Sequence, residues 1–565
     1  MKKLLFILVI LLLATGAWAV PAKRNIWKTF TLSDGTEVRA RLYGDEHLHF
    51  WLTNDGLRLT DDGSPLTEHP RAMSRMPRNQ RRLALAPQHA ASRQSSKKAP
   101  SAYIGKKKGL IILAEFTDVK FKKANNLDKY LKIINEPGYT SSEGFQGSVA
   151  DYFRDQSGGL FDLTFDVYGP VSLSRNQKYY GENNSNGDDM HAEDMIVEAC
   201  DAINDQVDFK DYDWDGDGYV DEVFVIYAGK GEADGGGSNT IWPHMYELSE
   251  TDHSIKRDGV IINVYACGNE IDSSGKINGI GTICHEFSHC LGYPDFYDSI
   301  NGKTFGMSFF DLMDAGCYNG DGFIPAGYSA YEKWVAGWIE LTELAAEDVA
   351  VDSLKPVSEG GHGYIIYNDD YNNEYYIIEN RQMTNWDAGL YGKGLMITHV
   401  DYDEDIWYWN IPNSILTADH EYVKEYGYPT NDHVRFTIFH ADNADAETYS
   451  GLMGDLYPYT KSEKAVNDSL TANSKPAATL YHPNAAGDKF MHGAILDIQQ
   501  NTDGTMGFYY RAPKVETGIR TIANNQQPTA DSKIYDLQGR CINGAEIRSG
   551  IYIRQGKKII VPRQR

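Results

Sequence analysis

Alternating apolar and polar positions mark the first part of the chain, residues 20–70, as β-rich. Apolar side chains alternate with polar ones in three short runs, and Asp-Gly, Gly-Asp and Asn-Asp-Gly turns separate these runs. Such alternation between turn signals is typical of strands with one buried face. We therefore expect strands at 27–32, 37–42 and 47–53.

A different pattern begins at Lys108, where continuous apolar runs replace the alternation. Gly109–Ala114 and Val223–Tyr227 are long enough for strands that are buried on both faces. Residues 191–204 instead place apolar side chains at helical spacing. The pattern predicts an α+β domain over 108–345, with further helices at 148–156 and 328–338 and a strand at 161–171. A helix that contains HEFSH and the loop after it are expected between about 280 and 316.

From residue 346 onward, the sequence pattern predicts mainly strands and turns. Short strand-like runs at 375–379, 394–400 and 434–440 predict a β-rich continuation over 346–510. A segment rich in Gln, Asn and Thr follows, and it predicts a linker at 511–531. The remaining residues, 532–565, form a small β module in this interpretation.

The N-terminus has the pattern of a secretion signal. Two lysines precede the apolar run Leu4–Ala14, and Ala17-Trp18-Ala19 is a small-x-small cleavage motif. The run is too short to span a bilayer comfortably, and no later segment is apolar enough to do so. We expect a signal peptide at 1–19 and a chain that leaves the cytoplasm without stable membrane insertion.

Charge excludes several classes of partner. The net charge is −25, although residues 71–108 contain eleven Lys or Arg and no Asp or Glu. An acidic body repels nucleic acids and anionic membranes. The basic stretch is rich in Ser, Ala, Gln and Pro, which predicts a flexible linker at 71–107, with a polyanion-binding patch as the alternative.

The six cysteines are widely scattered and form no CxxC pair, so they predict no disulfide scaffold. A single disulfide involving Cys284 or Cys290 remains open at this point.

The helix expected near the start of 280–316 contains the sequence HEFSH, which suits a zinc site. Residues four apart lie on one face of a helix, so His285 and His289 project toward a common point. Glu286 follows the first histidine, where it is placed to act as a general base. The motif therefore predicts zinc ligands at His285 and His289 and a catalytic role for Glu286.

A third protein ligand is expected after the helix. Gly292 suits a left-handed helix terminus that turns the chain back toward the metal. Asp295, six residues after His289, is the preferred ligand, and Asp298 is the alternative. The downstream run 310–316 has the form of a Met-turn, with Met313 beneath the zinc.

An acidic loop at 213–222 predicts a second metal site. Its carboxylates occupy positions 1, 3 and 5 of an EF-hand-like loop, glycine occupies position 6 and an apolar residue position 8. Phe224 stands at position 12, so Asp221 or Glu222 must supply the closing oxygen; a register shifted to Asp211 is the alternative. The expected calcium ligands are Asp213, Asp215, Asp217, Asp221 and the backbone carbonyl of Tyr219.

The motifs together resemble the immune inhibitor A family of secreted, metzincin-like metallopeptidases (peptidase family M6). The resemblance rests on HEFSHCLGYPDFYD, FDLMDAG, SVADYFRDQSGGLFDLTFDVYGPV, IWPH, EYYIIENRQ and WDAGLYGKGLMITHVD, and it covers about 108–510. It implies a metzincin-like catalytic domain with zinc and calcium. Ser288 and Tyr293 depart from the residues usual in the family, and neither is a ligand position.

Further resemblances concern the two ends of the chain. Residues 20–70 resemble the propeptides that precede such domains, with a permanent accessory domain as the alternative. IYDLQGR at 534–540 and GIYIRQGKKIIV at 550–561 resemble the C-terminal sorting domain of the type IX secretion system. That resemblance implies export through the periplasm to the cell surface or medium, with the secretion machinery as partner.

The expected function is that of a secreted, monomeric zinc metalloendopeptidase. In this hypothesis a zinc-activated water attacks peptide bonds of protein substrates, with Glu286 as general base. The alternative is a non-catalytic extracellular adhesin or glycan-binding protein on the same fold. Loss of Glu286 or of a ligand would mark that alternative, and the sequence retains all of them.

Overall fold

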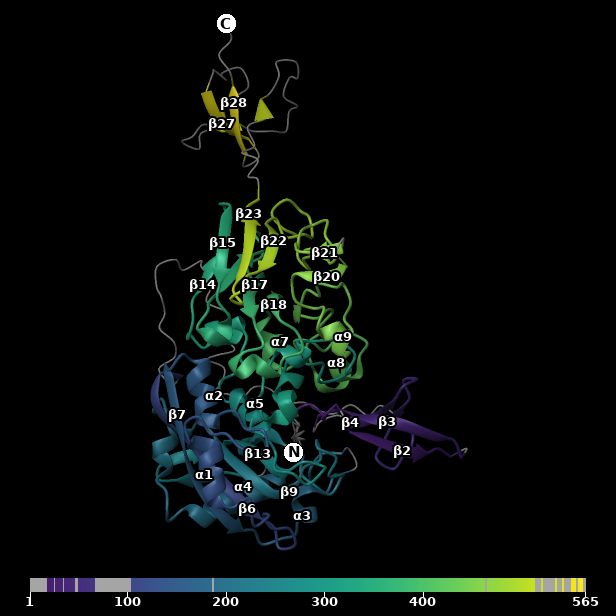
Figure 1. Ribbon diagram of the computed structural model, residues 1–565, viewed down its shortest axis with the longest axis vertical. Helices are drawn as coiled ribbons and strands as arrows, with labels where there is room; N and C mark the ends of the chain where they lie inside the picture. Colours follow the sequence, from purple (N-terminus) through teal and green to yellow (C-terminus); the bar gives the residue numbers. More distant parts are fainter. Residues whose placement is uncertain are drawn as a thin grey trace, which may run out of the picture. The chain divides into compact units, whose positions relative to one another are not determined.

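The computed structural model describes residues 18–66 and 103–513, apart from 25, 34, 46–48, 185–186, 252 and 463–464, and short strands between 520 and 561 (Figure 1). The chain divides into two compact units, Met1–Arg511 and Ala512–Arg565. Among the described helices, none is long and apolar enough to cross a membrane.

A six-stranded sheet organises the first half of the larger unit. Its strand order is β1-β10-β13-β9-β6-β7. The four strands from β13 to β7 are parallel, whereas β10 and β1 run antiparallel at the other edge. The strands are β1 (Trp18–Ala19), β6 (Gly105–Glu115), β7 (Phe161–Ser172), β9 (Val223–Lys230), β10 (His244–Glu247) and β13 (Val264–Ile271).

Helices cover both faces of this sheet, which explains its continuous apolar strands. In β6, Ile111 and Leu113 belong to one buried cluster, and Leu110 and Ile112 belong to the other. The first cluster includes residues of α1 (Leu127–Asn135), α2 (Val149–Gln156) and α5 (Gly281–His289). The second includes residues of α3 (Gln177–Gly181) and α4 (Ala192–Ile203). The mixture of helices and strands, the helix at 148–156 and the helix at 191–204 agree with the sequence prediction. The mostly parallel sheet with helices on both faces is an α/β layer arrangement rather than the expected α+β one.

The helix α5 packs closely on the segment that follows it. A Cβ atom on Gly281 would lie 1.8 Å from the carbonyl oxygen of Cys317, within the short helix η7 (Ala315–Gly322). Only glycine permits this approach. The contact fixes α5 against the region that contains Met313.

The β-rich continuation contains two further sheets. One has the order β14-β16-β17-β18-β19, and the other β15-β23-β22. Their strands are β14 (Leu341–Glu343), β15 (Val349–Leu354), β16 (Gly363–Tyr367), β17 (Glu374–Arg381), β18 (Gly394–Asp401), β19 (Phe436–Ile438), β22 (Ala494–Gln500) and β23 (Met506–Arg511). Short helices accompany them: α6 (Ala330–Val335), α7 (Glu404–Tyr408), α8 (Glu421–Tyr426) and α9 (Tyr449–Leu452). The helix expected at 328–338 is thus shorter than predicted, because Ser329 and Glu332 form a capping box that starts it later.

Two small sheets complete the larger unit. One contains β8 (Tyr219–Val220), β11 (Ile255–Arg257) and β12 (Val260–Ile262), and the other contains β20 (Tyr459–Ser462) and β21 (Ala465–Asn467).

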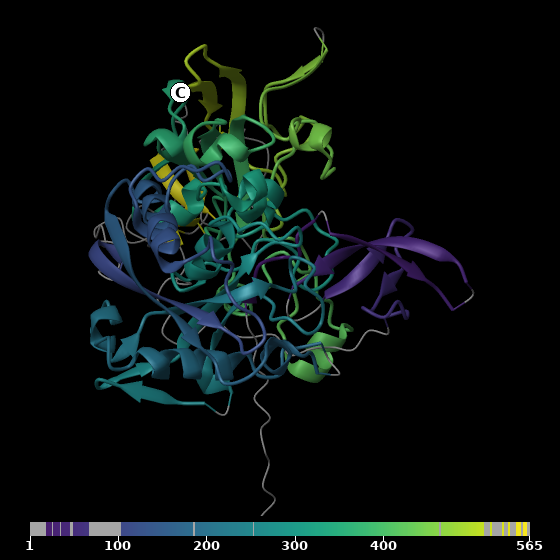
Figure 2. The same ribbon diagram turned by 60° about the horizontal axis from the view of Figure 1, so that its bottom comes forward.

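The N-terminal residues form a separate antiparallel sheet in the same unit. It contains β2 (Trp27–Thr31), β3 (Glu37–Gly44), β4 (His49–Thr53) and β5 (Arg58–Leu59), in that order. The strands agree closely with those expected at 27–32, 37–42 and 47–53. They project from the main body in both views (purple in Figures 1 and 2).

The smaller unit contains a five-stranded sheet in the order β24-β28-β27-β25-β26. Its strands are β24 (Arg520–Thr521), β25 (Ile534–Tyr535), β26 (Cys541–Ile542), β27 (Gly550–Arg554) and β28 (Lys557–Val561). Two of these strands begin the segments 534–540 and 550–561 that carry the resemblance to a sorting domain.

Candidate active site

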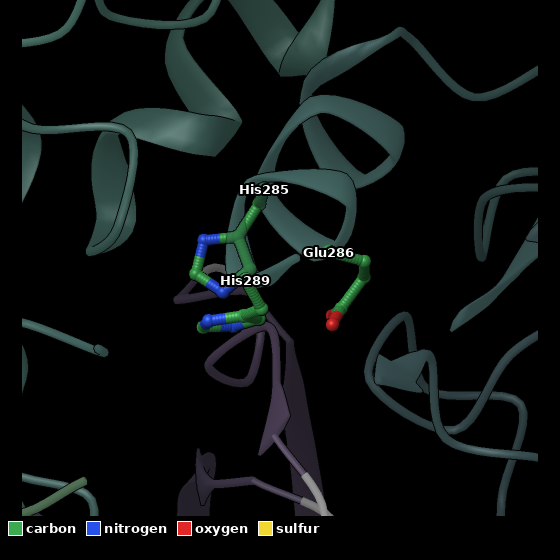
Figure 3. A group of neighbouring side chains, drawn as sticks. All are labelled: His285, Glu286 and His289. Atoms are coloured by element: carbon green, nitrogen blue, oxygen red, sulfur yellow. The ribbon is translucent and has the colours of Figure 1, made fainter. Parts of the chain in front are cut away.

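Three side chains of α5 form the centre of the candidate site (Figure 3). His285, Glu286 and His289 are fully buried, and one ligand atom from each lies within 4.8 Å of the others. The two imidazoles lie close together, with Glu286 beside them (Figure 3). Helical spacing produces this grouping directly, as the sequence predicted.

Backbone carbonyl groups orient both imidazoles. Nδ1 of His285 lies 2.8 Å from the carbonyl oxygen of Leu312, and Nδ1 of His289 lies 2.8 Å from that of Tyr293. A carbonyl oxygen only accepts hydrogen bonds, so each Nδ1 carries the proton. In a neutral imidazole this tautomer carries its lone pair on Nε2, the atom that would bind a metal.

Asp295 lies next to both histidines. Its Oδ1 atom is 3.1 Å from Nε2 of His285 and 3.6 Å from Nε2 of His289. Gly292 has a φ of 91°, so it ends the helix in the left-handed region, as its position in the sequence indicated. This turn brings Asp295 back to the face of α5 that bears the imidazoles.

Asn410 holds the Asp295 carboxylate in place from the β-rich region. Its Nδ2 donates to Oδ2 of Asp295 at 2.7 Å, and its Oδ1 accepts from the Asp295 backbone nitrogen at 2.7 Å. Asn410 is buried and has a φ of 55°, in a region that asparagine tolerates better than most residues. The pair directs the other oxygen, Oδ1, toward the histidines.

The donor set fits a zinc ion. Ligands bound at 2.0–2.1 Å in tetrahedral geometry lie about 3.4 Å apart, close to the separations between Asp295 and the two histidines. Nε2 of His285 and Oδ1 of Asp295 are buried without a hydrogen bond in the described structure. Burial also lowers the pKa of His289 to about 3, which keeps the imidazole neutral. Neutral imidazoles and a carboxylate are ordinary zinc ligands.

The predicted Met-turn supports two of these ligands. The carbonyl oxygen of Leu312 is the partner of His285, and that of Met313 accepts from the backbone nitrogen of Phe296, next to Asp295. Asp311 accepts from the backbone nitrogen of Met313 and stabilises the turn. Met313 is fully buried in the same core cluster as α5.

Asp298, the alternative ligand, is engaged elsewhere. Its Oδ1 accepts from the backbone nitrogens of Ile300 and Asn301, and its Oδ2 accepts from that of Lys303. These bonds hold a turn. The geometry therefore favours Asp295 over Asp298 as the third ligand.

The N-terminal segment lies against Glu286. The backbone nitrogen of Val20 donates to Oε1 of Glu286 at 2.6 Å, and Val20 is buried. The preceding β1, at the edge of the sheet, pairs with β10, with Ala19 opposite His244. Part of the N-terminal ribbon runs beside the three side chains (purple in Figure 3).

Two aromatic side chains bind the next carbonyl groups of this segment. Nε1 of Trp242 donates to the Val20 carbonyl at 3.0 Å, and the Tyr318 hydroxyl donates to the Pro21 carbonyl at 2.7 Å. Both aromatic residues come from the catalytic domain. The segment is thus held as an extended peptide across the site.

The acidic loop brings together some of the expected calcium ligands. Carboxylate oxygens of Asp213, Asp215 and Asp217 lie within 4.8 Å of one another. Backbone nitrogens of the same loop donate to these carboxylates, and the nitrogen of Tyr219 donates to Asp217. The loop then enters β8 and the core strand β9.

The closing residues of the loop are arranged differently. Asp221 accepts from the backbone nitrogen of Trp214 at 2.6 Å. Burial and the nearby carboxylates of Asp215, Asp213 and Asp217 together raise the pKa of Asp221 to about 8, although the hydrogen bond from the Trp214 backbone lowers it in part. Glu222 is buried near Cys290, and burial raises its pKa well above the ordinary value.

The cysteines in the described core are free. Cys284 and Cys290, on either side of the histidines, are buried thiols, as are Cys200, Cys267 and Cys317. The disulfide that the sequence left open is therefore absent for these five residues.

Sequence reasoning missed Asn410 and the role of Trp242. Asn410 lies far from the HEFSH motif and stands in no metal-binding pattern. Trp242 belongs to the IWPH motif, which was noticed only through a family resemblance.

Comparison with known proteins relates part of this chain to a peptidase family. Residues 102–339 match the family model described as "Immune inhibitor A peptidase M6, catalytic domain". The matched region, called the M6 domain below, includes α5, Asp295 and the run 310–316. The match supports a metallopeptidase, and M6 metallopeptidases are zinc-dependent in general.

Two curated proteins are similar in sequence to part of this chain. The chain is 26% identical over 261 residues to "Pre-pro-metalloprotease PrtV" of Vibrio cholerae, an alignment that covers 38% of this chain and 27% of the relative. It is 26% identical over 310 residues to "Immune inhibitor A" of Bacillus thuringiensis subsp. alesti, covering 45% and 44%. The chain thus spans less than half the length of these relatives.

Proposed function

We propose that the protein is a secreted zinc metalloendopeptidase. The observation that carries this proposal is the grouping of two imidazoles and one oriented carboxylate next to a buried glutamate. His285, His289 and Asp295 would hold the ion. When bound, zinc supplies a Lewis acid that polarises the scissile carbonyl and lowers the pKa of water toward about 7.

Glu286 moves the proton in this proposal. A general base must lie within hydrogen-bond reach of the atoms between which it transfers a proton. Oε1 of Glu286 lies 2.6 Å from a backbone nitrogen of the bound segment, that of Val20. A carboxylate in this place is suited to accept a proton from water and donate it to the leaving nitrogen of a cleaved peptide.

Residues 20–70 act as a propeptide in this proposal. The segment occupies the place of a substrate, because Glu286, Trp242 and Tyr318 all bind its backbone. Asp45 of this segment is buried and accepts from the Tyr297 hydroxyl at 3.2 Å. His47 lies outside the described residues, as do residues 71–102 of the basic linker.

The acidic loop binds structural calcium in this proposal. Three clustered carboxylates repel one another unless a cation lies between them. The raised pKa of Asp221 reflects burial and the same crowding. The ion would stabilise the segment that leads into β9.

Export through the periplasm by the type IX secretion system is proposed for the chain. The support is the resemblance of residues 534–540 and 550–561 to its sorting signals and the expected signal peptide at 1–19. The expected oligomeric state is monomeric, and protein substrates are the expected partners.

A casein digest tests the proposed activity. The active secreted protein should degrade casein, and a zinc chelator should abolish this degradation. Glu286→Gln should retain zinc and lose at least about 99% of the activity, because only the base is removed. Glu425→Gln, an exposed residue, is the matched control. Substantial casein hydrolysis by Glu286→Gln would contradict the assigned role.

A further inference from the structure

The N-terminal segment shows how a polypeptide lies in the cleft. The backbone nitrogen bound by Glu286 belongs to Val20, and the next two carbonyl groups are bound by Trp242 and Tyr318. If this nitrogen marks the leaving group of a scissile bond, Val20 is the first residue after that bond. Lys23 and Arg24 are then the fourth and fifth.

The fourth residue meets a carboxylate of the M6 domain. Nζ of Lys23 lies 3.5 Å from Oδ1 of Asp234, and both side chains are at most one-tenth exposed. Asn269 and Asn278 each donate to the other oxygen of Asp234 at 2.9 Å. Asp234 is therefore oriented by the catalytic domain itself and not by the segment.

The fifth residue meets two carboxylates. The Arg24 guanidinium lies 2.5 Å from Glu447 and 3.6 Å from Asp314. Asp314 is fully buried and accepts from the backbone nitrogens of Met307, Ser308 and Ala315. Its position is thus also fixed by the protein around the cleft.

Departure of the segment would leave these carboxylates without their cations. A buried carboxylate that loses its cation is destabilised, because its charge is then neither solvated nor paired. A cationic side chain that binds in the same place removes this cost. A substrate extended along the same path would place its own fourth and fifth side chains beside Asp234 and the Asp314–Glu447 pair. Basic side chains there gain the ion pairs that Lys23 and Arg24 now make.

We propose that the cleft selects polypeptides with basic residues four and five positions after the scissile bond, through Asp234 and the Asp314–Glu447 pair. This inference rests on the proposed endopeptidase function and specifies its substrate class. Asp234 selects the fourth side chain, and Glu447 with Asp314 selects the fifth. The contacts are independent, so the two preferences are separable.

Four internally quenched peptides test this proposal on the active secreted protein. All contain Trp-Ala-Val-Pro-Ala, followed by Lys-Arg, Gln-Arg, Lys-Gln or Gln-Gln, and mass spectrometry verifies cleavage between Ala and Val. The expected kcat/KM is at least about tenfold higher for Lys-Arg than for Gln-Gln. Each single basic residue should give an intermediate value.

Two variants assign the preferences to residues. Asp234→Asn should remove the preference for Lys over Gln at the fourth position and retain that for Arg at the fifth. Glu447→Gln should remove the preference for Arg over Gln at the fifth position and retain that for Lys at the fourth. The Glu447 side chain is 28% exposed, so this variant should fold even if Asp234→Asn does not. Asp419→Asn, at a side chain that is 94% exposed, loses the same charge and controls for general attraction of cationic peptides to an acidic protein.

The outcomes separate this proposal from the proposed function. The two subsites would be overturned if the four peptides gave kcat/KM values within twofold of one another. They would also be overturned if both variants lowered kcat/KM equally for all four peptides. Cleavage of casein without cleavage of any peptide at the Ala-Val bond would overturn them as well. Absence of all hydrolysis, of casein included, would instead contradict the endopeptidase activity and remove the basis of this inference.

Discussion

The backbone nitrogen of Val20 donates a 2.6 Å hydrogen bond to the Glu286 carboxylate across 266 residues of sequence. If Glu286 is the general base of the proposed peptidase, this peptide lies where a substrate would bind. In that proposal the N-terminal segment competes with substrates for the same groups.

Release of this segment should activate the protein. The secreted chain should be inactive while residues 20–66 occupy the cleft and active once cleaved within about 71–108. Mass spectrometry of the active form should find its N-terminus in that range. A synthetic or recombinant 20–66 segment should inhibit the active form competitively. An active form that still begins at Val20 would make the segment an accessory domain.

Asp295→Ala should lower zinc content as well as activity, because it removes a ligand. Asp298→Ala should retain zinc, since Asp298 binds only backbone nitrogens of its turn. Metal analysis of the purified variants distinguishes the two. Full zinc occupancy in Asp295→Ala, together with zinc loss in Asp298→Ala, would transfer the ligand assignment to Asp298.

Calcium removal should destabilise the M6 domain and leave its zinc in place. The clustered carboxylates of Asp213, Asp215 and Asp217 would then repel one another next to β8 and β9. A loss of about 2 kcal/mol would lower the melting temperature by roughly 4–8 °C. Melting with a calcium-selective chelator, followed by zinc analysis, measures this. Asp217→Asn should reduce the calcium effect, and an unchanged melting temperature would favour an ordinary acidic turn.

The contribution of Glu379 to the free energy of unfolding should fall as pH rises. Burial raises its pKa to about 7 from 4.5, although Arg381 and Lys333 lower it in part. Between pH 4.5 and 7 the Glu379 carboxyl is protonated in the folded state and ionised in the unfolded state. Its contribution to the free energy of unfolding is therefore complete below pH 4.5 and is lost as pH rises through 7. Between these limits the contribution of Glu379 should fall by about 3 kcal/mol.

Urea unfolding at pH 5 and pH 8 measures this effect. The amide of Glu379→Gln does not titrate. The free energy of unfolding of the wild type minus that of this variant should therefore be lower at pH 8 than at pH 5. Glu425→Gln serves as the exposed control. A difference that is independent of pH would contradict the raised pKa.

Local patterns predicted much of the structure, because they act over short distances. The spacing of His285 and His289 on one helical face and the left-handed turn at Gly292 both follow from nearby residues. The two-sided burial of β6 follows from its continuous apolar run. The limits of α6 were less accurate, because they depend on a capping box rather than on apolar spacing.

Long-range contacts could not be predicted in the same way. Asn410 reaches Asp295 across 115 residues, and Val20 reaches Glu286 across more than twice that distance. A single sequence carries no signal for such pairs. The ion pairs of Lys23 and Arg24 were hidden for the same reason, since their partners lie in three separate loops.

The hold of Asn410 on Asp295 has a practical consequence for the boundaries of the enzyme. The family match ends at residue 339, so a fragment cut there would contain every expected zinc ligand and Glu286 but lack Asn410. Its aspartate would lose both hydrogen bonds that orient it. Zinc retention therefore reports whether the β-rich region has docked on the catalytic domain, although that region contributes no expected ligand. The smallest piece able to keep its metal should extend past residue 410.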